Sequence, residues 1–465
     1  MRRGILAMGL IACGGAKGSP DAAPPAWQKG LPPASMMGTT RGLSPARGII
    51  HLHSPYSHDA CDGNPRPPND TGPVDETCLS HQRLALCTDR IDFAAMTDHA
   101  DTMAEADFPL LFLMRDGDEA VNAQDGHQIA SKIHCDNGHT ALVMVGTENA
   151  IMPIMLDHHV PGDAAARRTI YKTDDATAVT AFHDAGATVW IAHTEQQTKP
   201  HLDLLQPDGI ELYNLHANID PDIRPMYLGL DASGAIQAVA EFADTGDPYI
   251  QPDLALISFL LPNGPALDRW NEQLAEGRHL PASAGTDAHE NALPLMLADG
   301  ERGDSYRRMI RWFANVALVA DPDDPTQIEA AVKAGRFFVA FEIFGTPVGF
   351  DAAIHAGGSV AGMGDTIAPT AGATFDVTLP TILDLDPSLP APEFAITIYR
   401  IDGGGVHALA TGPGPTLSAP ADQPGAYRAE IHIKPHHLGV YLGHLGTAPA
   451  DGDFPWIYSN PVYVE

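Results

Sequence analysis

Short apolar segments alternate with helical ones between about residues 46 and 345, and this alternation constrains the fold more than any other feature of the chain. Strands are expected at residues 48–53, 90–96, 140–145, 188–192, 209–213 and 282–284. Helices are expected at residues 175–185, closed by Gly186, and at residues 324–335, with Pro325 at the first helical position. Alternating strands and helices favour a parallel sheet or a barrel.

Side chains that bind metals stand at or just after the ends of these strands. They are His51, His53, His99, Glu148, His193, Asp287 and His289. Because parallel strands end at the same edge of a sheet or barrel, we expect these side chains to meet. Alternation along a strand puts His51 and His53 on one face, and Asp287 and His289 repeat this spacing. Mixed imidazole and carboxylate donors suit zinc, iron or manganese.

The order of these motifs resembles that of a known family. His-x-His-Ser, Thr-Asp-His, Gly-x-Glu, a histidine at a strand end and Gly-Thr-Asp-x-His resemble the motif set of the polymerase and histidinol phosphatase (PHP) superfamily. Over residues 46–345 the resemblance implies an α/β fold, a distorted seven-stranded β/α barrel that holds two or three divalent ions (Zn, Mn or Fe). It also implies that the seven residues are metal ligands and that Glu148 bridges two ions.

Two further positions that the resemblance implies stay open. The family often has an aspartate ligand shortly after the first histidine pair, and here His58 stands at that place with Asp59 beside it. Either side chain could bind an ion or assist the leaving group. A histidine ligand is also usual shortly after the glutamate, and His158 and His159 both follow Glu148; we favour His159 because an apolar residue follows it.

Glu211 and Asn214 lie at the end of another expected strand. We expect them to line the pocket, and we rank them above the neighbouring His216. The sequence therefore predicts a catalytic cleft in which Glu148, His58 and Asp59 act beside the metal ions.

The expected activity is metal-dependent hydrolysis of a small phosphate ester by a hydroxide that bridges two ions. Two alternatives remain: hydrolysis of a carboxyl or carbamate ester at the same site, and a non-catalytic lipoprotein that binds metal or glycan. The net charge of −32, from 27 basic and 59 acidic residues, leads us to expect no nucleic acid partner.

The two ends of the chain carry other signals. Residues 1–12 resemble a lipoprotein signal peptide, with lipid attachment at Cys13, and residues 13–45 are expected to form a flexible tether. The expected location is a bacterial cell envelope, on the outer membrane, with the lipid as the sole membrane contact. Residues 346–465 are expected to form a small all-β, sandwich-like domain. Cys61, Cys78, Cys87 and Cys135 permit two disulfides in any of three pairings.

Overall fold

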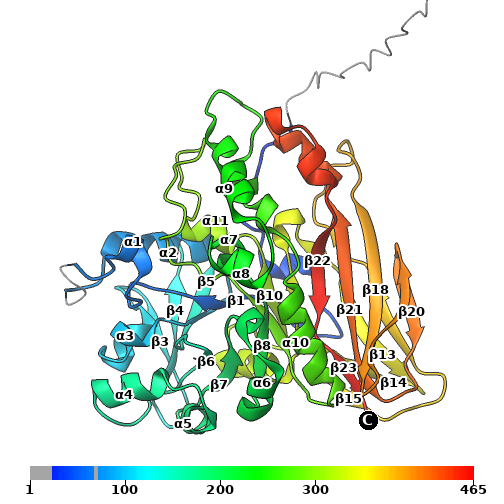
Figure 1. The fold of residues 1–465 in the computed structure, drawn as a ribbon, viewed down its shortest axis with the longest axis horizontal. Coiled ribbons are helices and arrows are strands. Elements are labelled where there is room, and N and C mark those ends of the chain that lie inside the picture. Colours follow the sequence, from blue (N-terminus) through cyan, green and yellow to red (C-terminus); the bar gives the residue numbers. More distant parts are fainter. Residues whose placement is uncertain (1–23, 68–71) are drawn as a thin grey trace, which may run out of the picture.

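The computed structural model describes residues 24–67 and 72–465 (Figure 1). Its largest sheet has thirteen strands. From one edge to the other, the main path of this sheet runs β15 (Thr366–Ile367), β23 (Val462–Val464), β21 (Gly425–Lys434), β22 (Phe454–Ser459), β11 (Phe337–Ala340), β10 (Ala314–Val319), β1 (Ser44–Leu52), β2 (Phe93–Met96), β5 (Thr140–Val145), β4 (Gln128–His134) and β3 (Glu119–Asn122). Off this path, β18 (Glu393–Asp402) pairs with β21 and with β19 (Gly405–Gly412).

Three smaller sheets complete the strand structure. The first contains β6 (Ile151–Ile154), β7 (Thr188–Ile191), β8 (Gly209–Asn214) and β9 (Ala282–Gly285). The second contains β14 (Ser359–Gly362), β13 (Asp351–Ala356), β16 (Thr374–Thr378) and β20 (Thr416–Pro420), and the third pairs β12 (Pro347–Val348) with β17 (Thr381–Ile382). The first of these sheets supplies half of the site described below.

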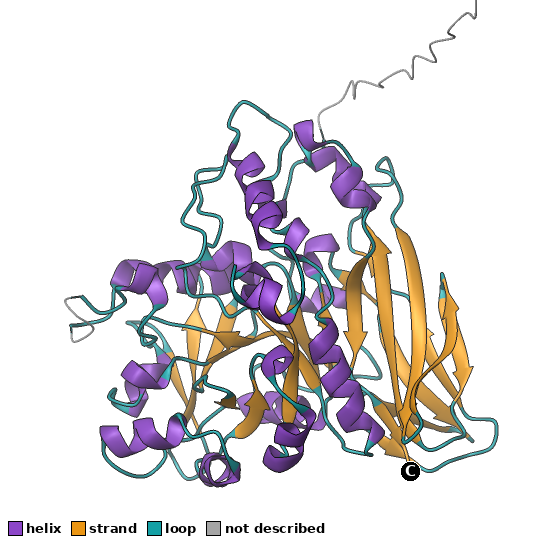
Figure 2. Cartoon of the chain, viewed as in Figure 1, coloured by secondary structure: helices purple, strands orange, loops and turns teal. Residues whose placement is uncertain are grey.

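The helices lie mainly around the strands of the first 345 residues, whereas strands dominate the C-terminal part (Figure 2). They are α1 (Ala60–Gly63), α2 (Glu76–Thr88), α3 (Ala100–Met103), α4 (Ala164–Tyr171), α5 (Ala176–Asp184), α6 (Lys199–Leu205), α7 (Leu215–Ile219), α8 (Ile223–Tyr227), α9 (Ala232–Ala240), α10 (Gly264–Ala275), α11 (Tyr306–Ile310) and α12 (Pro325–Ala334). The predicted helices are present as α5 and α12. Asp175 and Asp324 cap their N-termini by accepting hydrogen bonds from two backbone amides each.

The predicted seven-stranded β/α barrel followed by a small all-β domain is wrong. β10 pairs antiparallel with both β1 and β11, and β11 pairs antiparallel with β22. Strands from both sides of residue 346 therefore belong to one large mixed sheet, which runs from the blue and cyan strands to the orange and red ones in Figure 1. The periodicity of a sequence indicates where strands lie, but it does not indicate which distant strands pair.

Parallel pairing nevertheless brings the strand ends together locally. β1, β2 and β5 run parallel in the large sheet, and β7, β8 and β9 run parallel in the smaller one. A parallel bridge between Leu52 and Ala288 joins the end of β1 to the segment after β9. A second bridge, between His99 and Glu148, joins the segments after β2 and β5. The C-terminal ends of both parallel sets consequently surround one position.

The described part of the predicted tether, residues 24–45, packs on the body instead of extending from it. The indole of Trp27 donates to Asp253 over 2.7 Å, and the carbonyl of Pro32 accepts a hydrogen bond from Arg47. The predicted signal peptide and the predicted lipid attachment site, Cys13, lie outside the described residues. No helix among the described residues is long and apolar enough to cross a membrane.

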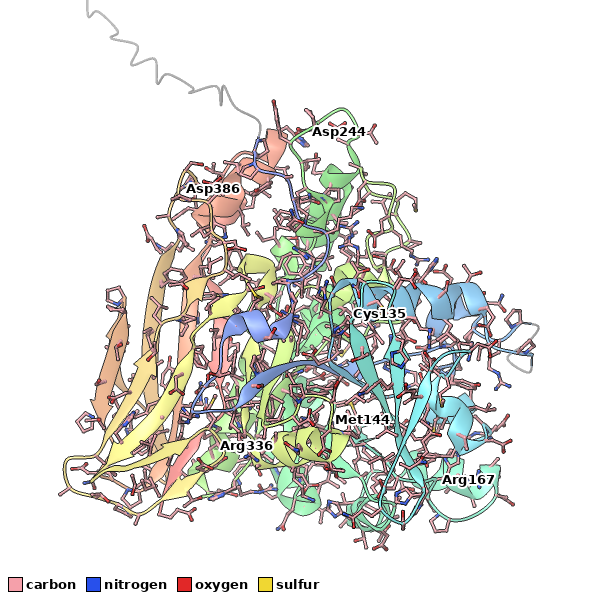
Figure 3. All side chains as sticks on the ribbon, turned by 180° about the vertical axis from the view of Figure 1, so that it is seen from behind. Cys135, Met144, Arg167, Asp244, Arg336 and Asp386 are labelled. Carbon is pink, nitrogen blue, oxygen red and sulfur yellow. A yellow bond between two sulfur atoms is a disulfide. The ribbon has the colours of Figure 1, made fainter. Side chains whose placement is uncertain are left out.

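Two disulfides settle the open cysteine pairing. Cys61 pairs with Cys78, and Cys87 pairs with Cys135. The first links α1 to α2, and the second links the end of α2 to the turn after β4. Figure 3 shows Cys135 beside the blue helix α2, seen from behind the molecule.

Candidate metal centre

Four buried side chains form the middle of the site, and we call them the inner group: His51, His53, Glu148 and Asp287. His51 lies at the end of β1 and His53 just beyond it, Glu148 follows β5, and Asp287 follows β9. One ligand atom from each lies within 4.8 Å of the others. The Nε2 atoms of His51 and His53 are 3.2 Å apart.

The carboxylate of Asp287 faces both histidines of the inner group. Its Oδ1 atom lies 3.2 Å from His51 Nε2 and 3.1 Å from His53 Nε2. The same Oδ1 atom is buried, yet it has no partner with hydrogen-bond geometry among residues 24–67 and 72–465. Buried polar atoms are normally satisfied, so these donors fit a cation held between them.

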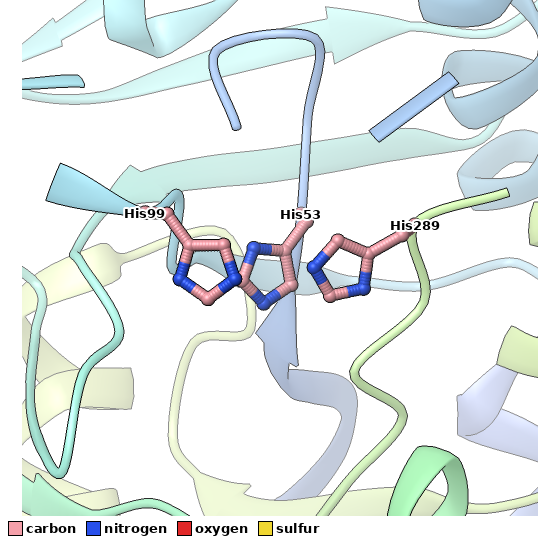
Figure 4. Close-up of side chains that lie close together, drawn as sticks. All are labelled: His53, His99 and His289. Carbon is pink, nitrogen blue, oxygen red and sulfur yellow. The ribbon is translucent and has the colours of Figure 1, made fainter. Parts of the chain in front are cut away.

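Three further side chains form what we call the outer group: His99, Asp59 and His289. Asp59 Oδ2 lies 3.4 Å from the Nε2 atoms of both His99 and His289. The rings of His99, His53 and His289 lie side by side, with His53 in the middle (Figure 4). Asp59 Oδ1 and His289 Nε2 are buried without hydrogen-bond partners in the described part of the chain. His53, His99 and His289 form a set that could hold a metal ion, and Asp59 contacts two of its three members.

Glu148, a member of the inner group, also faces His99 of the outer group and a fifth histidine, His193. Its Oε2 atom lies 3.1 Å from His99 Nδ1 and 3.7 Å from His53 Nε2. Its Oε1 atom lies 3.4 Å from Nε2 of His193, which follows β7. The two oxygens therefore face different donors, the arrangement expected of a carboxylate that bridges ions.

Neighbouring polar groups orient the ligand rings. His51 Nδ1 donates to Glu211 Oε1 over 2.8 Å, and His193 Nδ1 donates to Glu195 Oε1 over 3.0 Å. His53 Nδ1 lies 2.9 Å from the Ser57 hydroxyl. Each contact occupies Nδ1 and leaves Nε2 facing the centre, which is the usual way in which metal-binding histidines are fixed.

The charges in the centre shift the pKa values of its side chains. Burial lowers the pKa of His51, but the carboxylates of Asp287 and Glu211 reverse this and hold it well above its usual range. Burial also lowers the pKa of His99, but Asp59 and Glu148 raise it to about 9. These carboxylates thus attract positive charge. In a metal-free protein, protons on the histidines supply this charge, and a divalent cation can take the place of those protons.

Three residues of the centre have left-handed backbone conformations. The φ angles are 86° at His51, 47° at His193 and 51° at Asp287. Such conformations cost roughly 1–3 kcal/mol each in a non-glycine residue and cluster at functional sites. The backbone is therefore bent at these strand ends, where the side chains point into the centre.

The structure separates the candidates that the sequence left open. Asp59 faces His99 and His289, whereas His58 lies at the exposed rim, with its ring centroid 5.2 Å from that of His99. His159, predicted as a ligand, is outside the centre because its two ring nitrogens contact the Tyr171 hydroxyl and the Ala106 carbonyl. Its neighbour His158 is exposed, with its Nδ1 atom 2.9 Å from the carbonyl oxygen of His159.

Of the predicted pocket residues, Glu211 and Asn214 both support the centre from behind the ligands. Besides His51, Glu211 accepts hydrogen bonds from the backbone amide of His193 and from Asn214 Nδ2. Asn214 Nδ2 also lies 3.3 Å from Asp287 Oδ2.

Sequence reasoning ranked His216 too low and missed Glu195. His216 Nδ1 lies 3.4 Å from Asp287 Oδ2, and the two belong, with His289, to another set of potential ligands. Glu195 follows His193 by two residues, and its Oε2 atom accepts a hydrogen bond from Asn263. The position of His216 directly after β8 was the available signal, whereas the Asn263 contact joins residues 68 positions apart.

No known family model matches the chain, and no curated protein matches it. Among solved structures, the chain is similar to a lesion-specific endonuclease from Pyrococcus furiosus, with 11% sequence identity and a TM-score of 0.29. The alignment covers 62% of this chain and 56% of the endonuclease chain. A likeness of this size establishes neither a common fold nor a common substrate.

The expected exclusion of nucleic acid as a partner is corrected, because the net charge of the whole chain does not exclude it. The net charge of −32 describes the whole chain, whereas the potential in a cleft depends on the local charges and on any bound cation. The buried cluster of histidine, aspartate and glutamate is compatible with a metal-dependent hydrolase.

Proposed function

We propose that this chain is a metal-dependent hydrolase of the PHP type that cleaves a phosphate ester. The observation that supports this proposal is the convergence of the inner group: four buried donors from three separate strand ends, with Asp287 Oδ1 unsatisfied by any described residue. The motif order of the sequence supports the family, and the mixed donors suit zinc, manganese or iron.

The donors divide among two or three ions in this proposal. The inner group would hold one ion. Glu148 and His193 would hold a second, with His216 close to the shared Asp287 carboxylate. The outer group would hold a third. Bound divalent ions supply Lewis-acid chemistry, lowering the pKa of water and neutralising charge on the reacting oxygens.

The protein side chains would then orient and assist. Glu211, Glu195 and Ser57 fix the ligand rings, so that the centre needs little rearrangement when substrate binds. His58 is exposed at the rim, where its Nδ1 atom lies 3.9 Å from Asp101. We propose that His58 donates a proton to the leaving alkoxide.

The test is a hydrolysis panel with protein stripped of metal and reloaded with Zn²⁺ or Mn²⁺. The panel contains an aryl phosphate monoester, an aryl phosphodiester, an aryl carboxyl ester and a DNA duplex with a damaged base. We expect metal-dependent turnover of at least one phosphate ester and its loss in Asp287→Ala. Turnover of the carboxyl ester alone would overturn the phosphoesterase assignment, and bound metal without any turnover would indicate a binding protein.

We also propose that the chain is exported and anchored by lipid at Cys13. The two disulfides support this proposal, because structural disulfides persist mainly in oxidising compartments. In a bacterial host, labelled fatty acid should be incorporated into the wild-type protein but not into Cys13→Ala. Equal labelling of the two would contradict the anchor.

A further inference from the structure

The carboxylate of the outer group comes from a loop and not from a strand end. Asp59 lies seven positions beyond Leu52, the last residue of β1, and directly before the short α1. Its side chain is 35% exposed, whereas those of Asp287 and Glu148 in the inner group are 3% and 6% exposed. The position of Asp59 therefore depends on whatever holds this loop.

Hydrogen bonds tie the loop to the segment that carries His289. The amide of Cys61 donates to the His289 carbonyl over 2.9 Å, and the amide of Asp62 donates to the Glu290 carbonyl over 3.1 Å. The side chain of Asn291 donates to the Asp59 carbonyl over 2.9 Å. The loop thus follows the His289 segment along its length, and this brings Asp59 to face His289.

The backbone of the loop adopts a conformation that needs external support. Cys61 and Asp62 both have φ angles of 56°, and Gly63 follows with φ 72°. Consecutive non-glycine residues in the left-handed region are unfavourable, and such stretches persist where the surrounding structure holds them. At Cys61 the support is covalent, because its sulfur is bonded to that of Cys78.

Cys78 lies on a helix that is itself fixed to the metal centre. Asp75 caps α2 by accepting from the amides of Thr77 and Cys78. One turn further along, Gln82 Nε2 donates to the carbonyl of His53 over 2.7 Å. The disulfide therefore joins the Asp59 loop to a buried helix that already contacts the chain at an inner ligand.

We propose that Cys61 and Cys78 are positioning residues for the outer metal position. Their disulfide holds Asp59 against His99 and His289, and it thereby sets the affinity of the outer group for a divalent cation. Three of the four inner members, His51, Glu148 and Asp287, are held independently of it at strand ends by Glu211, β5 and β9. This inference rests on the proposed metal centre.

The second disulfide provides a matched control. Cys87–Cys135 also involves α2, but it joins the far end of this helix to the turn after β4. It spans 48 residues, against 17 for Cys61–Cys78. A longer closed loop restricts the unfolded chain more, so its removal is expected to cost at least as much global stability. If the loss of zinc affinity merely followed the loss of global stability, it would be at least as large in C87S/C135S.

The experiment measures Zn²⁺ binding by metal-free, full-length protein, using titration calorimetry together with elemental analysis. Asp59→Asn identifies the class of sites that belongs to the outer group. In C61S/C78S we expect the affinity of that class to fall about ten- to a hundred-fold, the usual range when support around a ligand is lost. We expect the inner class to be unchanged in C61S/C78S and both classes to be unchanged in C87S/C135S.

Unchanged outer affinity in C61S/C78S would overturn the inference, and so would equal losses in the two double variants. Should C61S/C78S fail to fold, Asn291→Ala tests the same point with both disulfides intact. It removes the donor to the Asp59 carbonyl, and it must weaken the outer class for the inference to stand. Absence of any Zn²⁺ binding by the wild type would refute the metal centre itself. By contrast, a wild type that binds zinc together with variants that bind it equally well would refute only the role of the disulfide.

Discussion

The inner and outer groups of the metal centre are built in different ways. The inner ligands leave the ends of β1, β5 and β9, are buried, and are oriented by side chains such as Glu211 that lie behind them. The outer group combines His99 and His289 with Asp59, which lies on a partly exposed loop. Strand ends fix a ligand through the sheet, whereas a loop needs separate support, so the two groups should respond differently to the same kind of substitution.

The largest effect should follow from Asp287→Asn, which changes the carboxylate that faces the inner histidines, His193 and His216. We expect zinc content to fall towards background and phosphate ester turnover to fall more than about a hundred-fold, since losing even supporting contacts costs about ten- to a hundred-fold. Elemental analysis and initial rates measure both. Asp136→Asn, at an exposed position, is the control. Full metal content in Asp287→Asn would contradict the assignment of the inner group.

A smaller and selective effect should follow from Asp59→Asn. We expect loss of the outer ion alone, with the inner ion retained and turnover reduced about ten- to a hundred-fold, the range for weakening a metal site through one of its contacts. Zinc per chain, measured before and after dialysis against a weak chelator, distinguishes the two groups. Loss of every ion at once would show that the groups are not separable.

Asp253 sharpens the comparison with the carboxylates of the metal centre. The negative charge of this buried side chain is paired with arginines and not with histidines. Burial would raise the pKa of Asp253, but Arg307, Arg308 and Arg311 lower it to about 2. Its unfolded pKa is about 3.9, so ionised Asp253 contributes about 3 kcal/mol of stability above pH 4, which is lost as the pH falls towards 2.

Urea unfolding of the wild type and Asp253→Asn between pH 2 and pH 7 measures this contribution. The difference in unfolding free energy should shrink as the pH falls through this window, and a chelator should leave the change unaltered. A difference that stays constant with pH would contradict the role of the arginines.

The smallest effect concerns Glu195, which accepts a hydrogen bond from His193. Glu195→Gln should weaken binding of the ion at His193 and Glu148 by about ten-fold, the lower end for a supporting residue. Competition with a chromophoric chelator measures the affinity. As a control, Glu276→Gln changes an exposed carboxylate paired with Lys199 and should leave metal binding unaltered.

The sequence predicted the local elements better than their assembly. Asp175 and Asp324 marked the starts of α5 and α12, because a capping side chain acts on amides two or three residues away. The antiparallel pairing of β11 with β22 joins residues more than a hundred positions apart, and no local pattern encodes it. The predicted barrel failed for this reason.

The same distinction applies within the site. His51 and Asp287 were found because a polar residue at the end of an apolar strand is visible in the sequence. His159 was predicted because the resemblance implies a histidine shortly after Glu148, but it contacts the Tyr171 hydroxyl and a backbone carbonyl, which satisfies both ring nitrogens. Whether a histidine faces a cavity or a neighbouring side chain is decided by the tertiary packing.

The pairing of β11 with β22 has a practical consequence for anyone who shortens this protein. A chain cut after residue 345 would keep every ligand of the centre but would bare the backbone edge of β11 along Phe338, Val339 and Ala340. Exposed apolar strand edges recruit other chains, so the truncated product would be prone to aggregation. The C-terminal strands thus cover an edge of the part that carries the candidate metal centre.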